Sequence, residues 1–382
     1  MKLLHFSDIH IGMENYSKLD PETGLFSRLL DFFKTFDFIV DTAIEQKVDA
    51  VVFAGDAYKT RDPNPTQQRG FGERVKRITK AGIPFILVVG NHDTPNAQGK
   101  ANTLDIYSAL EIDNVWISRI PELLNIETKS GNLQIVTLPW LHKNDYKTVA
   151  ERLRLLLEKV RQSQPAILLS HVEIEGASYG SEKGMAIGND VTIPLPLLQD
   201  KRLNYVALGH IHKHQVLSKN PLVVYAGSPE RIDFGEEKEE KGICLVEIDE
   251  TTTFRFIPTG ARKFLTIIVN LKPEDSDPTQ IVLNEISKNE IAEKIVRLVI
   301  NIPAECEGEI KMDLIKKALS KAHYIAGISR NIERKERLKI DGQEEVERLT
   351  PVEALQKYFA AKKIDGVKRK QLEKYAAQLL ES

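Results

Sequence analysis

Cysteine is scarce in this 382-residue sequence, which contains only Cys244 and Cys306. The two lie far apart and form no Cys-x-x-Cys pair, so neither a disulfide framework nor a thiolate metal site is expected. A reducing compartment is the natural setting for such a composition. We therefore expect a cytoplasmic protein.

Long apolar runs are also missing. No segment approaches the ~20 consecutive apolar residues that cross a membrane, and the opening residues MKLLHFSDIH hold no apolar stretch of signal-peptide length. We expect no membrane contact. An excess of either charge is missing as well, because 53 Lys and Arg against 55 Asp and Glu give a net charge of −2. Nucleic-acid binding would then depend on a local basic surface or on a partner.

What the sequence does contain is a regular alternation of short apolar strands and amphipathic helices. The length predicts two or three domains. Strands are expected at residues 2–6, 48–54, 83–89, 133–138, 166–169, 205–208 and 222–225, and helices at residues 27–47, 66–81 and 146–162. This alternation predicts an α/β fold with a layered core over residues 1–260.

The pattern changes after residue 260. Strands at 264–270 and 294–302 alternate with helices at 278–288 and 312–322, which predicts a small α/β capping domain over residues 261–345. The last part, residues 346–382, is predicted to be a helical tail. It begins with a capping box at Thr350 and Glu353. An apolar stripe runs along its last helix through Leu372, Tyr375, Ala376, Leu379 and Leu380. These helices could dock on a partner or pack on their own chain.

Residues with metal-binding chemistry follow five of the expected strands directly. They are Asp8 and His10 after the first strand, Asp56 after the second, Asn91, His92 and Asp93 after the third, His171 after the strand at 166–169, and His210 and His212 after the strand at 205–208. Open α/β sheets form their ligand crevices at the carboxyl ends of strands. One such motif arises easily by chance. Five in order are not explained by core packing, because carboxylates and imidazoles are costly to bury unpaired.

The types of ligand indicate the class of metal. Carboxylate, imidazole and amide donors without thiolate suit a divalent ion such as Mn, Fe or Zn. There are too many donors for one tetrahedral ion, so the pattern predicts two ions roughly 3.5–4 Å apart with a bridging carboxylate, for which Asp56 is the candidate. Such a pair activates water and clamps a phosphoryl group, so the predicted chemistry is phosphoester hydrolysis.

The strings SDIHIG, AGDAYKT, VGNHD, LSHVE and ALGHIHK, taken in order, resemble the motifs of the calcineurin-like metallophosphoesterases. The further string GSPERIDFGE at residues 227–236 is similar to the SbcD-type nucleases of DNA double-strand-break repair. The resemblance covers about residues 1–260. It implies a layered calcineurin-like core, to which the small capping domain and the helical tail are added.

The resemblance also implies roles for individual residues. One ion would be held by Asp8, His10, Asp56 and His212, and the other by Asp56, Asn91, His171 and His210. His92 would stabilise the transition state or protonate the leaving oxygen, with Asp93 orienting its imidazole.

The same resemblance implies cofactors, activities and partners. The ions would be Mn²⁺, and the reactions would be exonuclease cleavage of duplex ends and endonuclease cleavage of single strands. The protein would be a homodimer that works on DNA in the nucleoid. Its partner would be an SbcC-type coiled-coil ATPase, bound through the helical tail.

Three basic residues are open to two interpretations. Lys59 stands where related nucleases often carry His or Asp, and both Lys59 and Arg61 are candidates for phosphate contact or plain surface cations. Arg231 is a candidate DNA contact, or it pairs with Asp233 to hold the loop around it.

Two other functions also fit the motifs. A phosphatase or cyclic-nucleotide phosphodiesterase would use the same site, because fold and site specify ester hydrolysis rather than a substrate. A non-catalytic scaffold is the third interpretation, and the complete set of expected ligands argues against it. The GSPERIDFGE string and the tail favour the nuclease.

Overall fold

The computed structural model describes residues 1–95, 100–141, 146–180, 191–333, 350, 353, 355–356, 358–359, 362 and 366–380. The chain divides into two compact units, one made of Met1–Ile267, Ile286–Leu298 and Lys316–Ile328, the other of Ile268–Glu285, Val299–Ile315 and Ser329–Ser382. The three-domain division expected from sequence stays a prediction. Its boundary at residues 345/346 lies outside the described residues.

Two six-stranded sheets form the body of the first unit. The first has the order β14-β13-β1-β2-β3-β4. Its strands are Thr252–Pro258, Gly242–Ile248, Lys2–Phe6, Ala50–Phe53, Phe85–Val88 and Val115–Ser118. The second has the order β11-β12-β10-β7-β6-β5. Its strands are Gln215–Lys219, Leu222–Tyr225, Tyr205–Gly209, Ala166–His171, Gly131–Leu138 and Glu122–Thr128.

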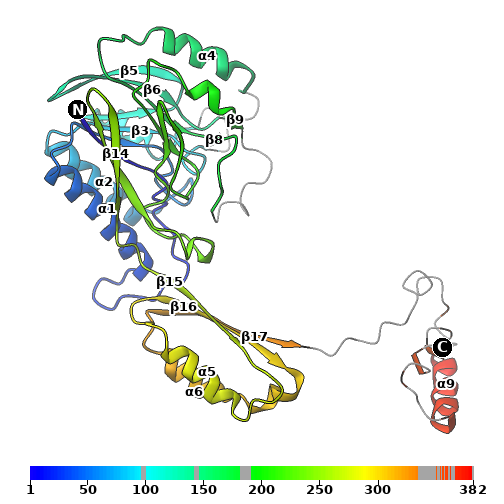
Figure 1. Ribbon diagram of the computed structural model, residues 1–382. Helices are drawn as coiled ribbons and strands as arrows, with labels where there is room; N and C mark the ends of the chain where they lie inside the picture. Colours follow the sequence, from blue (N-terminus) through cyan, green and yellow to red (C-terminus); the bar gives the residue numbers. More distant parts are fainter. Residues whose placement is uncertain are drawn as a thin grey trace. The chain divides into compact units, whose positions relative to one another are not determined.

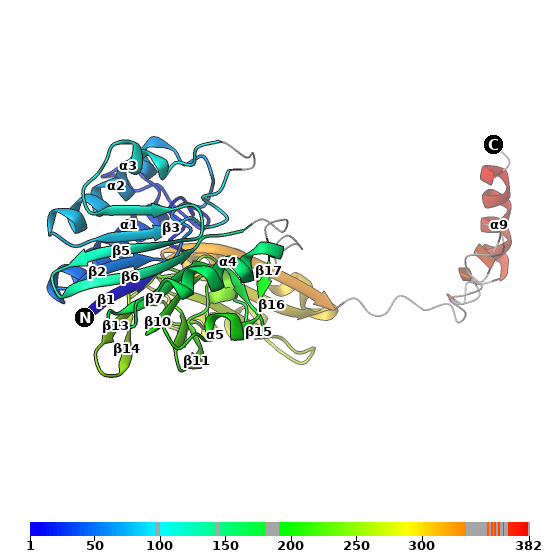
Figure 2. The ribbon, with the colours of Figure 1, turned by 90° about the horizontal axis from the view of Figure 1, so that it is seen from above.

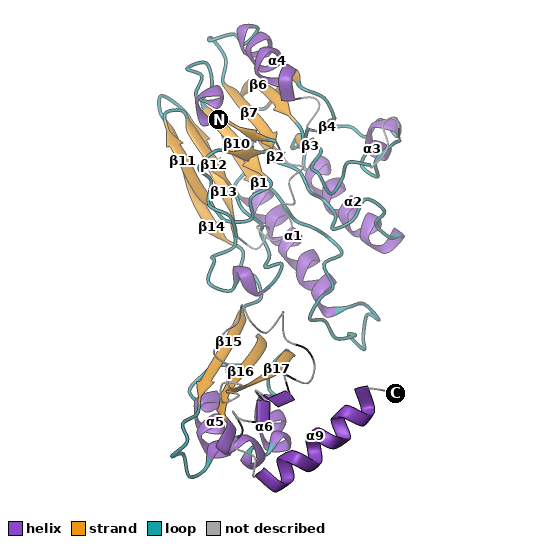
Figure 3. Ribbon diagram, turned by 90° about the vertical axis from the view of Figure 1, so that its right-hand side faces the viewer, coloured by secondary structure: helices purple, strands orange, loops and turns teal. Residues whose placement is uncertain are grey.

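Strand direction decides where the functional residues meet. In the first sheet β1, β2, β3 and β4 run parallel. In the second sheet β6, β7, β10 and β12 run parallel (Figure 3). The outer strands β5, β11, β13 and β14 pair antiparallel with their neighbours. Each sheet therefore gathers the carboxyl ends of several strands at one edge.

Helices cover the outer faces of the sheets. The helices α1 (Ser27–Glu45) and α2 (Pro65–Lys80) pack on the first sheet, and α4 (Tyr146–Glu158) packs on the second. Figures 1 and 2 show α1 and α2 together on one side and α4 on the other. A third apolar cluster, from both sheets, fills the space between them. The body thus has four layers, helix, sheet, sheet and helix, which confirms the layered α/β fold expected from sequence.

Local sequence explains where α2 begins. The side chain of Asn64 accepts a hydrogen bond from the backbone N–H of Gln67, and the side-chain oxygen of Gln67 accepts one from the N–H of Asn64. Pro65 occupies the first helical position, where no N–H is needed. This capping box satisfies two N–H groups that a helix start would otherwise leave unpaired.

Several strands lie outside the ranges expected from sequence. They are β4, β5, β11, β13 and β14 of the two large sheets, together with the strands at Glu173–Ile174, Thr192–Ile193 and Tyr324–Glu333. The edge strand β14 alternates between partly buried and exposed residues, so its sequence lacks the continuous apolar run of the buried parallel strands. By contrast β13 is apolar and nearly all buried, and the sequence analysis nevertheless did not expect it.

The remaining elements are short or belong to the later part of the chain. A three-stranded sheet has the order β15-β16-β17, formed by Phe264–Asn270, Ile295–Pro303 and Tyr324–Glu333. The remaining helices are α3 (Asp105–Ala109), α5 (Pro278–Ser287), α6 (Met312–Leu319) and α9 (Gly366–Leu380). The strands β8 (Glu173–Ile174) and β9 (Thr192–Ile193) pair with each other. The 3₁₀ turns are η3 (Leu195–Leu198), η4 (Phe234–Glu236) and η5 (Ala304–Glu309).

The expected start of the tail is present in part. The side chain of Glu353 accepts hydrogen bonds from the N–H and the hydroxyl of Thr350 at 2.8 Å each. Pro351 and Val352 lie outside the described residues. Among the described helices, none has the length and apolarity required to span a bilayer.

A buried ion pair ties α1 to the segment that follows β12. Arg28 is 1% exposed and donates to Glu230 at 3.3 Å and to Asp31 at 2.9 Å. Thr35 donates to the other carboxylate oxygen of Glu230 at 3.2 Å. Since removing one partner of a buried pair costs about 3–5 kcal/mol, this pair fixes residues 228–241 firmly against α1. We call residues 228–241 the Glu236 loop.

Candidate metal centre

The expected site residues come together because five strand ends converge. Asp8 and His10 follow β1, Asp56 follows β2, and Asn91 and His92 follow β3 in the first sheet. His171 ends β7, and His210 and His212 follow β10 in the second sheet. All of these side chains belong to one polar cluster linked by short contacts.

The backbone is strained where this cluster is built. Four cluster residues have positive φ, namely Asp8 at 52°, His10 at 44°, Asp56 at 61° and His210 at 93°. Residues other than glycine rarely adopt this conformation, and such outliers gather at functional sites. The strain turns each chain sharply at the end of its strand, so that the polar side chain faces the cluster instead of continuing the pleat.

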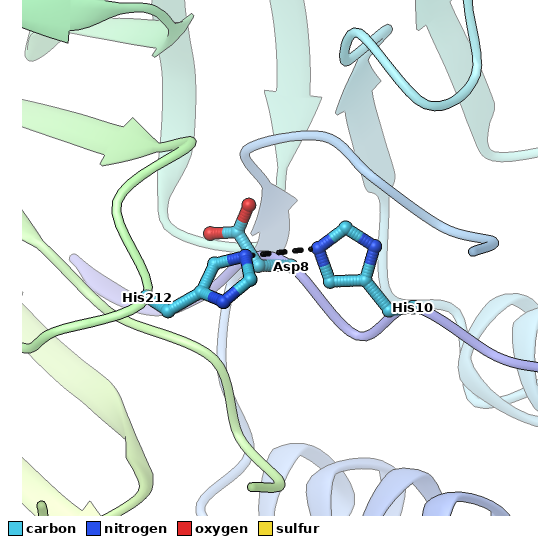
Figure 4. Close-up of side chains that lie close together, drawn as sticks. All are labelled: Asp8, His10 and His212. Atoms are coloured by element: carbon cyan, nitrogen blue, oxygen red, sulfur yellow. Dashed lines mark hydrogen bonds between the residues drawn. The ribbon is translucent and has the colours of Figure 1, made fainter. Parts of the chain in front are cut away.

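Asp8, His10 and His212 form a first donor set (Figure 4). The Nε2 atoms of His10 and His212 face each other at 3.0 Å. Two imidazole nitrogens bond directly only if one of them carries a proton, whereas a cation between them accepts a lone pair from both. Both carboxylate oxygens of Asp8 also accept the backbone N–H of His210, at 3.0 and 3.2 Å. Asp8 thereby links the loops after β1 and β10.

Asn91, His171 and His210 form a second donor set. The amide oxygen of Asn91 lies 3.0 Å from His171 Nε2 and 3.2 Å from His210 Nδ1. His171 Nδ1 lies 2.7 Å from the carbonyl oxygen of Ala54. Because that oxygen can only accept, Nδ1 carries a proton, and Nε2 is the ring nitrogen that faces the cluster.

Asp56 lies between the two donor sets. Its Oδ2 atom is 3.7 Å from His10 Nε2 and 3.4 Å from His171 Nε2. Burial alone would raise the pKa of Asp56, but the imidazoles of His171 and His92 hold it well below its usual range. Burial would also lower the pKa of His171, and the Asp56 carboxylate instead raises it to about 9. The negative charge of Asp56 is thus the electrostatic centre of the cluster.

At two other members, His10 and Asp8, burial outweighs the neighbouring charges that oppose it. It lowers the pKa of His10 well below its usual value and raises the pKa of Asp8. Neutral imidazoles together with carboxylate and amide oxygens are the donors that divalent cations take in proteins. The cluster therefore suits divalent metal ions. Its donor atoms face one another at short distances, such as 3.0 Å between the Nε2 atoms of His10 and His212 and 3.4 Å between Asp56 Oδ2 and His171 Nε2.

His92 is only partly buried, and backbone groups hold it in place. Its N–H donates to Asp56 Oδ1 at 2.9 Å, and its ring Nδ1 lies 2.6 Å from the carbonyl oxygen of Lys59. The ring meets that of His10 edge to face at 4.8 Å. With Nδ1 donating to Lys59, the Nε2 atom of His92 is directed away from that contact.

Asp93 does not orient the His92 ring as expected. Its carboxylate accepts the backbone N–H groups of Asp56, Ala57 and Gly90 at 2.9, 3.0 and 3.1 Å. Burial and the nearby Asp56 charge raise the pKa of Asp93 to about 7. Asp93 instead joins the loops after β2 and β3, and the Lys59 carbonyl takes the expected place beside the imidazole. Asp93 is adjacent to His92 in sequence, but its carboxylate binds backbone N–H groups and not the imidazole.

Lys59 and Arg61 lie beside His92. Together with Thr60, Asp62 and Asn91 they line an open pocket of about 420 Å³. The Arg61 guanidinium donates to the backbone carbonyls of Thr94 and Asn91. Arg61 therefore also braces the turn that carries Asn91 and His92, a role that the sequence did not indicate.

Arg231 is buried at 7% exposure and does not face solvent as a DNA contact would. Its guanidinium donates to the carbonyls of Ala261, Arg262 and Glu239. The expected ion pair with Asp233 does not form, since the Asp233 carboxylate accepts the N–H of Gly235 instead. A buried arginine needs several acceptors, and these three carbonyls supply them.

One residue of the site was not expected from sequence. Glu236 lies 2.8 Å from Nδ1 of His212 and is fully buried. The string GSPERIDFGE served only as a mark of resemblance, although its last residue, a glutamate next to a predicted metal centre, was a signal. Sequence spacing alone does not bring Glu236 to His212, because 24 residues and two strands separate them.

Comparison with known proteins agrees with this geometry. Residues 1–214 match the family model described as calcineurin-like phosphoesterase, which is more than half of the chain. The chain therefore belongs to the calcineurin-like phosphoesterase family.

Its relatives by sequence point to a narrower group. The chain is 28% identical to the DNA double-strand break repair protein Mre11 of Sulfurisphaera tokodaii, over 70% of this chain and 65% of the relative. It is 26% identical to the protein of the same name from Saccharolobus solfataricus, over 85% of this chain and 80% of the relative. It is 25% identical to an SbcCD nuclease subunit of Bacillus subtilis, over 65% of this chain and 66% of the relative.

Gly90 provides a test of the cluster that alters no donor. A Cβ atom at Gly90 would lie 2.1 Å from Asp56 Oδ1 and 2.6 Å from the Asp56 nitrogen, so Asp56 must shift. We expect Gly90→Ala to weaken divalent-metal binding roughly 10–100-fold, as changes just outside a ligand shell do. Calorimetric titration of the metal-free chain with MnCl₂ measures this. Gly327→Ala, where a Cβ meets nothing within 4 Å, should bind as the wild type does. Equal affinity in the folded Gly90 variant would contradict the placement of Asp56.

Proposed function

We propose that this chain is the metal-dependent nuclease subunit of a DNA-end-processing complex. The observation that carries the proposal is the extent of the likeness to a DNA double-strand break repair protein, which covers 85% of the chain. It continues past residue 214, where the general phosphoesterase model ends. A phosphatase sharing only the fold would match over the catalytic core alone.

The proposed centre holds two divalent ions. The first is assigned to Asp8, His10, Asp56 and His212, and the second to Asp56, Asn91, His171 and His210. The position of Asp56 Oδ2 within 3.7 Å of one set and 3.4 Å of the other supports a bridging role. Manganese is the ion we propose, since an all oxygen and nitrogen donor set accepts it.

Two divalent ions held by these residues would lower the pKa of a bound water and neutralise the charge of a phosphodiester. The chain's own contribution begins with His92. The Lys59 carbonyl fixes its ring, so that Nε2 is available to donate a proton to the leaving oxygen or to stabilise the transition state. Lys59 and Arg61 line the adjacent pocket and are proposed to contact backbone phosphates of DNA. Asp93 keeps the loops that carry Asp56 and Asn91 together.

The proposed activities are exonuclease cleavage of duplex ends and endonuclease cleavage of single strands. The proposed assembly is a homodimer in the cytoplasm, associated with the nucleoid and with an SbcC-type coiled-coil ATPase. Capping and DNA guidance are assigned to residues 261–345, and docking to residues 346–382. On α9, Leu372 is 37% and Tyr375 is 66% exposed, which leaves apolar surface for a partner helix.

A substrate comparison tests the nuclease against a phosphatase or cyclic-nucleotide phosphodiesterase on the same fold. We expect the purified chain with MnCl₂ to release nucleotides from duplex DNA ends and to cut single-stranded circles, with little turnover of p-nitrophenyl phosphate or cyclic AMP. Gel analysis of labelled DNA and absorbance of released nitrophenol measure the two activities. Rapid turnover of the small esters with intact DNA would favour the alternative.

His92→Ala tests the catalytic assignment. We expect DNA cleavage to fall by roughly 10²–10⁴-fold, the contribution of a general acid, while two ions per chain remain bound. Metal analysis after gel filtration and the nuclease assay are measured on the same sample. Loss of one ion would make His92 a ligand, which its grouping with His10 and Asp56 allows geometrically. Undiminished cleavage would remove it from the mechanism.

Deletion of residues 350–382 tests the docking role of the tail. We expect the shortened chain to lose co-purification with an SbcC-type ATPase and to keep its own nuclease activity, because the metal centre lies within residues 8–212. Leu372→Glu with Tyr375→Glu in the full-length chain is the milder variant and should have the same effect. Co-purification of both variants at the wild-type level would show that the tail does not dock the ATPase.

A further inference from the structure

The side of His212 turned away from the cluster has a carboxylate partner. His212 Nε2 faces His10 in the first donor set, and Nδ1 lies 2.8 Å from Oε1 of Glu236. An ionised carboxylate only accepts hydrogen bonds, so Nδ1 carries the proton and Nε2 presents its lone pair. The tautomer and the ring orientation of His212 are therefore set from behind by Glu236.

Glu236 is held in turn by three further donors. Its Oε2 atom accepts from Lys241 Nζ at 2.8 Å, from the backbone N–H of Ile232 at 2.9 Å and from Ser228 Oγ at 3.3 Å. Its side chain has no solvent exposure. With both oxygens engaged and no water access, the carboxylate has a single available position.

Lys241 is matched to this arrangement. Its ammonium group reaches Glu236 at 2.8 Å, Glu239 at 2.7 Å and the carbonyl oxygen of His212 at 3.0 Å, which uses all three of its N–H donors. The Lys241 side chain is 1% exposed. A buried carboxylate next to an imidazole would be costly without a cation, and Lys241 supplies that cation to Glu236 while holding the His212 backbone.

We propose that Glu236 and Lys241 form an outer shell of the metal centre, in which Glu236 is a positioning residue that presents His212 Nε2 to the ion and Lys241 fixes Glu236. This inference rests on the proposed function in one respect, that His212 is a metal ligand. Carboxylates behind ligating imidazoles fix the ring and raise its basicity, and their loss typically lowers metal affinity 10–100-fold.

The Glu236 loop does not need the Glu236 contact to keep its path. Glu230 binds Arg28 and Thr35, and Arg231 binds the carbonyls of Ala261 and Arg262. Glu237 accepts the N–H of Thr266 at 2.7 Å and its hydroxyl at 2.6 Å. Because the loop is anchored at these points, we expect a change at Glu236 to alter the orientation of His212 and to leave the path of the loop unchanged.

Adjacent residues of the loop offer a matched pair of variants. Glu236 faces the metal ligand, and Glu237 faces Thr266 of β15. Removing the Glu237 carboxylate loses two hydrogen bonds and one negative charge without touching the cluster. Glu237→Ala therefore controls for general damage to the loop. Glu236→Gln is an intermediate variant, because its amide oxygen still accepts the Nδ1 proton while its amide nitrogen faces the Lys241 and Ile232 donors.

The experiment is a calorimetric titration of the metal-free full chain with MnCl₂, with thermal unfolding of each variant followed by circular dichroism. We expect Glu236→Ala to lower the binding affinity for one of the two ions roughly 10–100-fold. The affinity for the other ion should stay within about threefold of the wild-type value. Glu236→Gln should fall between the wild type and Glu236→Ala, and Glu237→Ala should bind both ions as the wild type does even if it melts earlier. Cobalt substitution adds an activity-independent readout, because the visible spectrum of one bound Co²⁺ should change in Glu236→Ala alone.

Four results would overturn the proposal. Wild-type affinity for both ions in folded Glu236→Ala would show that His212 needs no outer support, while leaving the proposed function intact. An equal loss in the Glu236→Ala and Glu237→Ala variants would make the effect general to the loop. If Glu236→Ala does not fold, the same decision rests on Glu236→Gln, for which undiminished binding counts against the proposal. Absence of any ion from the wild-type chain would remove the proposed function and this inference together.

Discussion

The structure depends on the burial of Asp56 at the meeting point of two sheets. A carboxylate with 2% exposure is expensive to keep ionised unless positive charge lies beside it. Besides the hydrogen bond from the His92 N–H, neighbouring imidazoles compensate this charge, and the coupling raises the pKa of His171 to about 9. In that arrangement His171 carries an additional proton, although the donor atoms of the cluster have lone pairs that suit a metal ion. The cluster is therefore better matched to divalent cations than to protons, which is the physical reason for interpreting it as a metal centre.

This constraint explains local features that look unfavourable when taken alone. Non-glycine residues with positive φ stand at three of the converging strand ends, after β1, β2 and β10. The close packing that forces these turns leaves no room for a side chain at Gly90 or Gly209, where a Cβ would lie 2.1 Å from Asp56 Oδ1 and 2.0 Å from the Ala54 oxygen. Three apolar clusters hold the sheets together, and their burial offsets the free-energy cost of these strained turns.

Much of this was predictable from the sequence, and the limits have physical causes. The layered α/β fold followed from apolar periodicity, and the polar cluster from donors placed directly after strands, because parallel strands bring their carboxyl ends to one edge. The antiparallel edge strand β14 was missed because half-exposed strands have mixed composition. The partner of His92 was mistaken because Asp93 is adjacent in sequence, whereas the Lys59 carbonyl arrives from another loop. Backbone carbonyl acceptors leave no pattern in the sequence. The partners of Arg231 could not be predicted for the same reason, because they are three backbone carbonyls.

The Glu236 loop shows how one string of residues serves two purposes. Glu236 turns inward to His212, and the next residue, Glu237, turns outward to Thr266 at the start of β15. Phe234, two residues earlier, packs edge to face on Phe264 at 4.9 Å and under the guanidinium of Arg297 at 4.3 Å. The loop is therefore held on both sides of Glu236, by Arg28 at Glu230 and by Thr266 at Glu237, and Glu236 faces His212 between these two anchors.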